Sequence, residues 1–520
     1  MELRTGTFWL TRIVLLRYVA FIYLIAFLVA YNQNEALIGK NGLLPAHVHL
    51  NRISKASNGG YWSKLHMAPT VLWFFNYNNN IDEILNSISF TGLLLSSFVI
   101  IKGSSNFVIM LSLWFLYHSV VNVGQRWYSF GWESQLLETG FLAVFLCPFF
   151  SLKKFPKTVP CSFLIIMLYR WLIFRIMLGA GLIKLRGDRC WWDLTCMNYH
   201  YETQPVPNPI SYYMHQEPVF FHKFETMVNH FVELIAPICL LMPRKFCIFG
   251  GLVQIVFQIV LIISGNLSFL NWLTIAPCLA CFDDLSLSYF FSKTEVINVK
   301  LIQRQNELEK QTPLILANFA RKCTNWLFVC VIAYLSIPIV QNLWSPNQIM
   351  NTSFEPLRIV NTYGAFGSIN KKRTEVIFQG TYSADPMNSD ANWLEYEFKC
   401  KPGNEKRWPC VISPYHYRLD WLMWFAAFQN YQHNPWLLHL GLKFLSNDNK
   451  TTSLVSHNPF SGKQPPKWIR AEHYQYSFTK IGSNSAKEGK WWKRRHIGSY
   501  LPPISLETAK HLVDRFYLID

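Results

Sequence analysis

The residues best suited to chemistry are charged side chains inside long apolar runs. They are two carboxylates and four guanidinium groups: Arg12, Arg17, Glu133, Glu138, Arg170 and Arg175. A charge in hydrocarbon is costly unless it is paired or hydrated. One interpretation is a polar cavity that acts on a lipid or a proton. The other is a network of ion pairs that fixes helix packing, and it is favoured because no carboxylate–histidine set recurs at catalytic spacing.

Common catalytic motifs are missing from the sequence. It has no phosphate loop, no G-x-S-x-G elbow, no H-E-x-x-H and no paired C-x-x-C motif of the zinc type. Cys278 and Cys281 are spaced as C-x-x-C, but they stand in an apolar run with no strand before it, which favours packed thiols. We therefore predict no cofactor and no metal site, and we do not expect an enzyme.

Four cysteines lie in polar loops at short spacing. Cys190 with Cys196, and Cys400 with Cys410, are predicted to form disulfides, which implies an oxidising compartment. The cysteines inside apolar runs are expected to stay thiols, as small buried hydrophobic residues: Cys147, Cys239, Cys278, Cys281 and Cys330.

Aromatic side chains in polar loops form the candidate binding surface. The loop 183–225 is rich in them, and the segment 490–496 mixes indoles with lysine and arginine. Such rings are typical of protein interfaces and of the membrane–water interface. The candidates for contact with a partner protein are Trp191, Trp192, Tyr199, Tyr201, Trp491 and Trp492. Packing of these rings on the protein itself remains an open alternative.

The elements that position these residues are apolar runs of membrane-helix type. The candidates are 8–31, 84–101, 107–123, 135–150, 161–183, 226–242, 246–263, 266–282 and 326–340. The first is too long for a signal peptide and predicts a retained signal anchor. The runs 135–150 and 226–242 carry charges, so re-entrant or packed positions remain open for both.

Charge and sequons agree on sidedness. With a cytosolic N-terminus, every short basic connection falls on the cytosolic side, as does the basic loop 283–325. The opposite side receives both cysteine pairs and the sequons at Asn351 and Asn449, which predicts that these asparagines are glycosylated in a lumen. A third sequon, at Asn266, abuts a span and is expected to stay unmodified.

The composition changes after about residue 340. Runs at 357–360, 375–380, 393–398 and within 467–481 predict strands, and 415–431 and 436–444 predict helices. The predicted fold is a multi-pass α-helical membrane bundle over 1–340, followed by a lumenal α+β, β-rich domain over 341–520. This second part is large enough to hold its own core.

Composition limits the partners. The chain is 51% apolar and only 15% charged, with a net charge of +17. Repeated apolar runs point to basic cytosolic loops as the source of that charge. Because the late basic cluster is predicted to be lumenal, nucleic acid is excluded as a partner.

Four blocks of the sequence resemble the lipase maturation factor family, most closely its type 1 branch. They are FWLTRIVLLRYVAFIYLIAFLVAYNQ (8–33), WYSFGWESQLLETGFLAVFLCPFF (127–150), LGAGLIKLRGDRCWWDLTCMNYHYETQPVPNP (178–209) and SGNLSFLNWLTIAPCLACFDD (264–284). The resemblance covers nearly the whole chain. It implies a multi-pass protein of the endoplasmic reticulum membrane, an accessory chaperone for the folding and assembly of secreted dimeric lipases such as lipoprotein lipase.

The resemblance also implies a lumenal domain, 341–520, that binds client lipase. The folding machinery of the endoplasmic reticulum and membrane lipid are the other expected partners. The family is usually described with five spans, fewer than the nine runs found here, and it offers no catalytic motif to carry over.

A weaker likeness, at the level of fold alone, connects the chain to membrane proteins of the vitamin K-dependent carboxylase type. It leaves open a membrane enzyme that acts on a lipid or protein substrate through buried Arg, Glu and His residues. Such an enzyme would lose its activity, but not its folding, when one of those residues is replaced.

Overall fold

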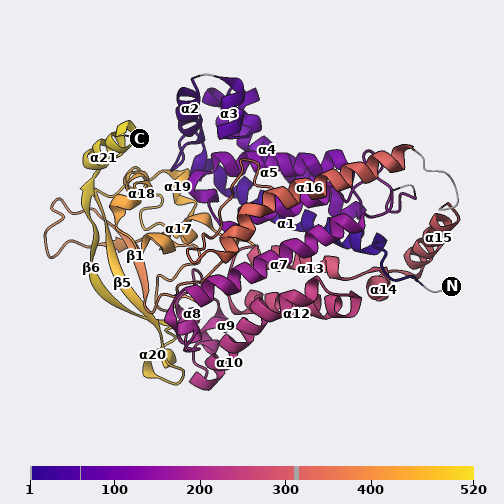
Figure 1. Ribbon diagram of the computed structural model, residues 1–520. Helices are drawn as coiled ribbons and strands as arrows, with labels where there is room; N and C mark the ends of the chain where they lie inside the picture. Colours follow the sequence, from indigo (N-terminus) through magenta and orange to yellow (C-terminus); the bar gives the residue numbers. More distant parts are fainter. Residues whose placement is uncertain (1–2, 59, 158, 310–315, 520) are drawn as a thin grey trace.

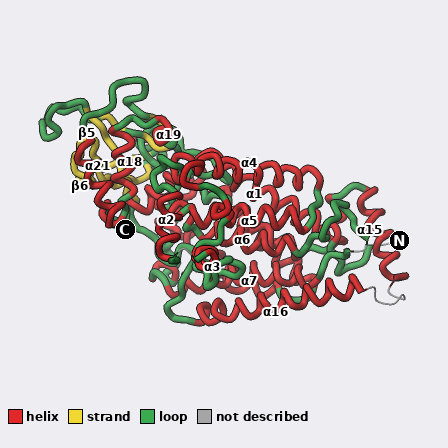
Figure 2. The backbone as a smooth tube through the Cα atoms, turned by 90° about the horizontal axis from the view of Figure 1, so that it is seen from above, coloured by secondary structure: helices red, strands yellow, loops and turns green. Residues whose placement is uncertain are grey.

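The computed structural model describes residues 3–58, 60–157, 159–309 and 316–519. Its long helices lie side by side, with an antiparallel sheet at one end and α15 (Lys293–Glu309) at the other (Figures 1 and 2). We call these the sheet end and the basic end of the bundle.

Among the described residues, five helices are long and apolar enough to cross a membrane. They are α1 (Trp9–Ile38), α4 (Tyr77–Lys102), α7 (Phe163–Arg186), α12 (Arg244–Ser264) and α16 (Leu316–Trp344). Each overlaps one of the predicted runs, and α4, α12 and α16 contain theirs entirely. A sixth segment passes the same test as a bent pair, with 117° between Leu270–Cys281 and Asp284–Phe290.

The other four predicted runs form shorter or broken helices within the bundle. They are α5 (Phe107–Val123), α6 (Gly131–Val144), the series α10 (Val219–His230), π-helical turn η4 (Phe231–Ile235) and α11 (Ala236–Leu240), and α13 (Leu270–Cys278). The run 135–150 is therefore displaced, because α6 begins four residues earlier and ends at Val144. The α10–α11 series carries an exposed apolar stripe along its length: Phe220, Phe224, Met227, Phe231, Ile235 and Ile238. An exposed apolar stripe of this length marks a surface that contacts lipid or another protein.

The basic end gathers the connections that carry lysine and arginine. Asp284 donates its backbone N–H to the carbonyl of Thr7 at 2.9 Å, which places the start of α1 beside α14 (Asp284–Leu287). Lys154 pairs with Glu295 at 2.7 Å, so the connection after α6 meets α15. The connections expected on one side of a membrane thus lie together in space.

The sheet end joins the other connections to the C-terminal region. Gln33, near the end of α1, donates to the carbonyl of His416 at 2.8 Å. Asn266, just after α12, donates to the carbonyl of Cys410 at 2.8 Å. The C-terminal region is therefore seated on the bundle.

The C-terminal region is built on a four-stranded antiparallel sheet with the strand order β2-β1-β5-β6. Its strands are β1 (Arg373–Thr381), β2 (Leu394–Glu395), β5 (Trp468–Phe478) and β6 (Trp492–Ser505), and a small second sheet pairs β3 (Glu397–Phe398) with β4 (Val455–His457). The runs at 375–380, 393–398 and 467–481 are confirmed as strands. The predicted strand at 357–360 is wrong, because the Glu355 carboxylate accepts the backbone N–H groups of Leu357, Ile359 and Val360 and holds a turn.

Helices α17 (Arg418–Ala426) and α18 (Trp436–Leu445) cover the sheet on the side facing the bundle (Figure 1), and α21 (Leu506–Ile519) packs on α18. The predicted helix 415–431 is thus shorter than expected. One continuous apolar core runs from α1 and α6 into β1 and α18. Trp127 and Trp436 meet across it with ring centroids 5.3 Å apart. The fold class is confirmed: a bundle of apolar helices followed by a region of helices and antiparallel strands.

Short elements complete the chain. They are α2 (Ala46–Ala56), α3 (Tyr61–Met67), η1 (Val71–Phe74), η2 (Gln125–Tyr128), η3 (Arg189–Trp191), α8 (Met197–Thr203), α9 (Pro209–Met214), η5 (Leu279–Cys281), η6 (Ser288–Phe290), η7 (Tyr431–His433), α19 (Asn449–Thr452) and α20 (Asn484–Lys487). Local signals start several of them. Asn208, for example, caps α9 by accepting the N–H of Ser211, whose hydroxyl accepts the N–H of Asn208.

Candidate functional site at the junction of the bundle and the C-terminal region

Helix α6 carries the two carboxylates that the sequence singled out. Almost all of this helix is buried, including Glu133 and Glu138, which are at most 2% exposed. A polar helix in the centre of a bundle requires partners for its charges. The surrounding residues supply them from both halves of the chain.

Glu133 is paired with a residue of the C-terminal region. Its carboxylate accepts from Arg418 of α17 at 2.6 Å, from the Trp132 indole at 2.9 Å and from the hydroxyl of Tyr117. The Arg418 guanidinium also lies over the Tyr128 ring, 3.5 Å from its centroid. Both charged side chains are fully buried.

Glu138 lies one and a half turns further along α6 and is paired within the bundle. It accepts from Arg175 of α7. Its other oxygen accepts from the Tyr363 hydroxyl at 2.6 Å and from the backbone N–H of Asn361 at 3.0 Å. The segment after residue 340 therefore closes this pair as well. We call these two ion pairs and their hydrogen-bond partners the α6 junction.

Only part of the predicted charge network meets here. Glu133, Glu138 and Arg175 belong to the α6 junction, whereas Arg12, Arg17 and Arg170 do not. Those three arginines donate instead to backbone carbonyls, of Val159 at 2.9 Å, Ile100 at 3.1 Å and Ala280 at 3.0 Å. Ile100 lies in the last turn of α4, where a carbonyl lacks a partner within the helix and a guanidinium satisfies it well.

Sequence reasoning missed several members of the network. Arg418, Asn361 and Tyr363 lie more than 200 residues from the carboxylates they contact. A further buried pair, Lys184 with Glu233 at 2.6 Å, joins the end of α7 to the π-helical turn. A basic residue opening a predicted helix, as Arg418 does, was the one available signal.

A second charged cluster lies inside the C-terminal region. Glu375 of β1 accepts from Arg373 and from Lys401, each at 2.6 Å, and all three side chains are fully buried. Arg373 also donates to the carbonyls of Glu202, Gln204 and Pro205, which ties the end of α8 to the sheet. Burial lowers the pKa of Lys401, and the Glu375 carboxylate opposes that shift.

Both clusters are closed. Every carboxylate in them is hydrogen-bonded to side chains or backbone, and no member is more than 9% exposed. Among the described residues, no group of three or more His, Cys, Asp or Glu side chains is arranged to hold a metal ion. The arrangement suits the fixing of one part of the chain against another.

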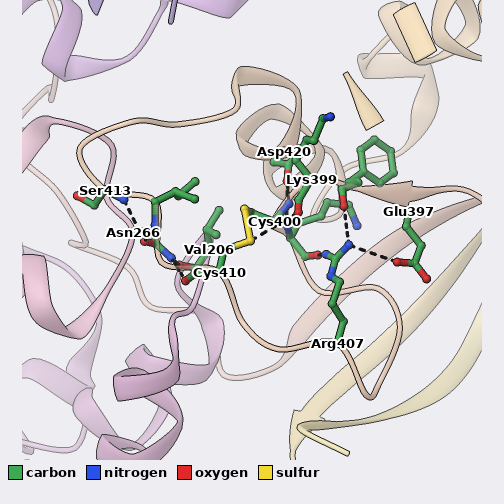
Figure 3. The surroundings of a disulfide bond; sticks show 12 residues. Val206, Asn266, Glu397, Lys399, Cys400, Arg407, Cys410, Ser413 and Asp420 are labelled. Atoms are coloured by element: carbon green, nitrogen blue, oxygen red, sulfur yellow. Dashed lines mark hydrogen bonds and ion pairs between the residues drawn. A yellow bond between two sulfur atoms is a disulfide. The ribbon is translucent and has the colours of Figure 1, made fainter. Parts of the chain in front are cut away.

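Both predicted disulfides are present. Cys190 and Cys196 are joined in the loop after α7, and Cys400 and Cys410 in the C-terminal region, with Cα atoms 4.9 and 5.5 Å apart. Figure 3 shows the second bridge between two anchors: the Asp420 carboxylate accepts the N–H of Cys400, and Asn266 donates to the carbonyl of Cys410. The bridge thus lies where the C-terminal region meets the bundle.

Mass spectrometry of the purified chain tests these disulfides. We expect Cys190, Cys196, Cys400 and Cys410 to resist alkylation until a reductant is added, whereas the exposed Cys323 is alkylated at once. Each bridge closes a short loop and should contribute about 2–3 kcal/mol to stability. Alkylation of Cys190 or Cys400 without reductant contradicts the assignment.

The aromatic candidates divide by exposure. Trp191, Tyr201 and Trp492 are at most 5% exposed, so they pack within the protein and are not a contact surface in this structure. Trp191, for example, donates its indole N–H to the carbonyl of Phe366 at 3.0 Å. This is the packing alternative that the sequence left open.

The remaining aromatic candidates are accessible. Trp192 is 65% exposed, and Tyr199 and Trp491 are half-buried. Trp491 lies against Trp408, which is 61% exposed and was not predicted, with ring centroids 4.5 Å apart. Tyr213, half exposed, lies on the other side of Trp491. We call Trp408, Trp491 and Tyr213 the aromatic patch.

The three sequons differ in accessibility. Asn351 and Asn449 are exposed on the sheet side of the molecule. Asn266 is 2% exposed, and its amide is held by the carbonyls of Val206 and Cys410 and by the N–H of Ile412. A glycan on Asn266 is therefore incompatible with the folded chain, which agrees with the expectation from sequence.

Two buried histidines make stability depend on pH. Burial, assisted by the charge of Lys184, lowers the pKa of His200 to about 4. Burial and the neighbouring Arg418 hold the pKa of His416 well below its usual value. In the unfolded chain both pKa values are about 6.5. The unfolded chain binds more protons as pH falls below that value, so we expect the folded state to lose about 2 kcal/mol per histidine by about pH 5.

Thermal unfolding of the detergent-solubilised chain between about pH 7.5 and pH 5 measures this loss. The His200→Asn substitution should flatten part of the dependence. His66 is exposed, so the His66→Asn control should leave the slope unchanged. A midpoint that is constant over this range contradicts the prediction.

Comparisons with known proteins show which family models match the two parts of the chain. Residues 10–289 match the family model of the lipase maturation factor transmembrane domain, and residues 359–502 match that of the lipase maturation factor C-terminal domain. The chain is 56% identical over 516 residues to Lipase maturation factor 1 of Bos taurus, which covers 98% of this chain and 91% of that relative.

Other relatives also match over most of the chain. The chain is 54% identical to Lipase maturation factor 1 of Homo sapiens over 512 residues, covering 98% and 90% of the two chains. It is 30% identical to Lipase maturation factor 2 of Xenopus tropicalis over 584 aligned positions, covering 93% and 81%. No solved structure matches. The first family model covers the carboxylates of the α6 junction and the second covers Arg418, so both halves of the junction lie within matched residues, and the chain belongs to the lipase maturation factor family.

Proposed function

We propose that this chain is a maturation factor of the endoplasmic reticulum membrane that assists secreted dimeric lipases, such as lipoprotein lipase, to fold and assemble. The observation that carries the proposal is its 56% identity, over 98% of its length, to a protein named for lipase maturation. It acts as an accessory chaperone and not as an enzyme. Binding a folding intermediate but not its aggregate shifts the client toward the assembled form by mass action.

The spatial separation of the two ends supports a proposed orientation. The basic end is cytosolic and the sheet end is lumenal, in keeping with the positive-inside rule. Helix α16 supports the placement of the bilayer, because its exposed Trp326 and Trp344 are separated by 18 residues, about 27 Å of helix. This is close to the thickness of the hydrocarbon core, about 30 Å.

Glycosylation and protease protection test the orientation. The Asn351→Gln and Asn449→Gln substitutions should each raise gel mobility if that site carries a glycan, and glycosidase treatment should have the same effect. The chain after residue 340 should resist protease added to sealed microsomes. Digestion of that region in sealed microsomes contradicts a lumenal C-terminal region.

The aromatic patch and Trp192 are the client surface. Exposed tryptophans within a folded frame are typical of binding hot spots. The patch lies at the end of β6, where the disulfide loop 400–410 reaches it through Trp408. Lys490 and Lys493 are neighbours of Trp491 in the sequence; Lys490 already pairs with Glu405 at 3.4 Å, so the exposed Lys493 is the charge that suits an acidic partner.

The functional test uses factor-deficient cells that express a client lipase. The Trp408→Ala, Trp491→Ala double variant should keep its abundance, and lipase activity per lipase mass should fall, because losing a hot spot costs about 2 kcal/mol, a factor of roughly 30 in affinity. The control is Trp468→Ala, a half-buried tryptophan at the opposite end of β5. Normal lipase activation by the double variant contradicts the assigned surface.

A third variant separates the chaperone from an enzyme. Tyr363→Phe removes a single hydroxyl from the α6 junction. A chaperone loses activity only in proportion to its own abundance. If the variant is abundant and binds client but does not activate it, the carboxylase-like enzyme is the better function.

A further inference from the structure

The segment between α1 and α4 stands apart from the rest of the bundle. Helices α2 and α3 project sideways beside α4, near the sheet end (Figure 1). Helix α3 buries none of its seven residues. In water, so short a helix with no buried face has little to stabilise it.

Large apolar side chains of this segment are exposed together. Trp62 is 83% exposed, Phe74 62%, Phe75 56% and Met67 51%. Tyr61 and Phe74 form a ring pair, 5.9 Å between centroids, so α3 and η1 present one surface. Single exposed apolar residues are ordinary, but a cluster of this size marks a binding surface.

Hydrogen bonds to α5 fix the position of the segment along the axis of the bundle. The carbonyl of Pro69 lies 3.0 Å from His118 Nδ1 and accepts from Asn122 at 3.0 Å, and Val71 donates to Ser119 at 2.9 Å. Ser119 stands four residues, about 6 Å, before the end of α5 at the sheet end. The segment therefore lies level with the last turns of the bundle, neither above it in the C-terminal region nor at its middle.

Other exposed rings mark the same end of the bundle. Tyr31 and Phe90 pair on the outer faces of α1 and α4, 6.4 Å apart. Trp344 ends α16 and is 82% exposed. Tryptophan and tyrosine gather in this way at the membrane–water interface, where a ring meets acyl chains and its polar atom meets headgroups.

The charge of the segment suits phospholipid headgroups. Between Glu35 and Asp82 the chain carries four basic residues and no acidic one: Lys40, Arg52, Lys55 and Lys64. Lys64 lies over the Trp73 ring, 5.7 Å from its centroid, on the same element as the exposed rings. Exposed aromatic rings with interspersed lysines are the features of a helix that lies in the membrane interface.

We propose that α3 and η1 form an interfacial foot, which lies in the lumenal leaflet at the boundary between headgroups and acyl chains and binds anionic phospholipid. The foot does not span the membrane. The segment just before α2 contacts α18, because the Leu43 carbonyl lies 2.8 Å from His439 Nδ1. The foot therefore links the C-terminal region to the bilayer. The foot is independent of client binding.

Site-specific photocrosslinking of the full chain tests the foot. The photoreactive p-benzoylphenylalanine replaces Trp62 or Phe75, and the protein is reconstituted in vesicles of phosphatidylcholine and phosphatidylserine that carry a clickable acyl chain. Phe98, exposed on the lipid side of α4, is the positive control, and Trp408 of the aromatic patch is the negative one. We expect lipid adducts at positions 62 and 75 comparable to those at 98, and none at 408.

Two results overturn the proposal. One is a lack of lipid adducts at 62 and 75 when position 98 gives them; the other is adducts to protein alone, which would assign the surface to a protein partner. A second arm tests the charge. In the Lys55→Gln, Lys64→Gln variant, adducts to phosphatidylserine should fall relative to those to phosphatidylcholine, and an unchanged ratio overturns the preference for anionic lipid.

Discussion

Replacing Arg418 by methionine should lower the free energy of unfolding by about 3–5 kcal/mol, because it leaves the buried carboxylate of Glu133 without its counter-charge. The Tyr117 hydroxyl and the Trp132 indole remain as donors, but neither carries a positive charge. The Glu133→Gln, Arg418→Met double variant should recover part of this loss, since it buries no uncompensated charge. Thermal unfolding in detergent of the wild type, the two single variants Arg418→Met and Glu133→Gln, and the double variant gives the coupling between the two residues.

A surface pair joins the same two parts of the chain and serves as the control. Lys450 of α19 pairs with Glu35 of α1, and the two side chains are 53% and 38% exposed. Lys450→Met should cost at most about 1 kcal/mol, as exposed ion pairs do. Equal effects of Lys450→Met and Arg418→Met would show that burial of the α6 junction is not what makes its ion pair matter.

Arg373→Met should be as damaging as Arg418→Met, and should again lower the free energy of unfolding by about 3–5 kcal/mol. It removes a fully buried guanidinium that donates to Glu375 and to three backbone carbonyls, one near the end of α8 and two just after it. Unsatisfied carbonyls in a dry interior add to the loss of the ion pair. Arg373→Lys keeps the charge but cannot reach all four acceptors. Its free energy of unfolding should therefore lie between those of the wild type and Arg373→Met.

The matched control lies on the neighbouring sheet edge. Arg495 of β6 is exposed and donates to Gln475 at 3.0 Å. Arg495→Met should change the unfolding midpoint little. Protease resistance of residues 341–520 provides a second measurement, and wild-type resistance of Arg373→Met would contradict the prediction.

The helices of the bundle could be predicted from the sequence because long apolar runs indicate membrane-type helices. Each of the nine runs overlaps a helix of the bundle, and α5 matches its prediction residue for residue. The number of long helices could not be read in the same way. Pro237 follows the π-helical turn, and α13 gives way to a short 3-10 turn, so two of the runs are interrupted by local geometry that hydropathy does not record.

The partners of the α6 carboxylates were beyond sequence reasoning for a different reason. Glu133 and Arg418 are 285 residues apart, and only the docking of the C-terminal region brings them together. Helical spacing relates residues within one element, and it says nothing about which distant element will supply a counter-charge. The burial of Trp191 and Trp492 depends on the same kind of long-range contact.

Strand prediction failed where a side chain competed for the backbone N–H groups that a strand would use in a sheet. The run 357–360 has the composition of a strand, but Glu355 captures its N–H groups. The start of strand β6 was singled out as a basic cluster, for which a solvated basic strand was one interpretation, and it lies at the edge of the sheet, where lysine and arginine are common.

The span of chain between the two members of the Glu133–Arg418 pair has a consequence for biosynthesis. Helix α6 and its Glu133 carboxylate are synthesised long before residue 418, so a nascent or shortened chain carries this acid without the base that pairs with it in the folded protein. An uncompensated charge at a buried position destabilises the packing of the helices around it. The last third of the chain thus acts as a completion signal for the first, and a polypeptide ending before Arg418 is expected to be cleared from the membrane and not to persist as a stable anchor.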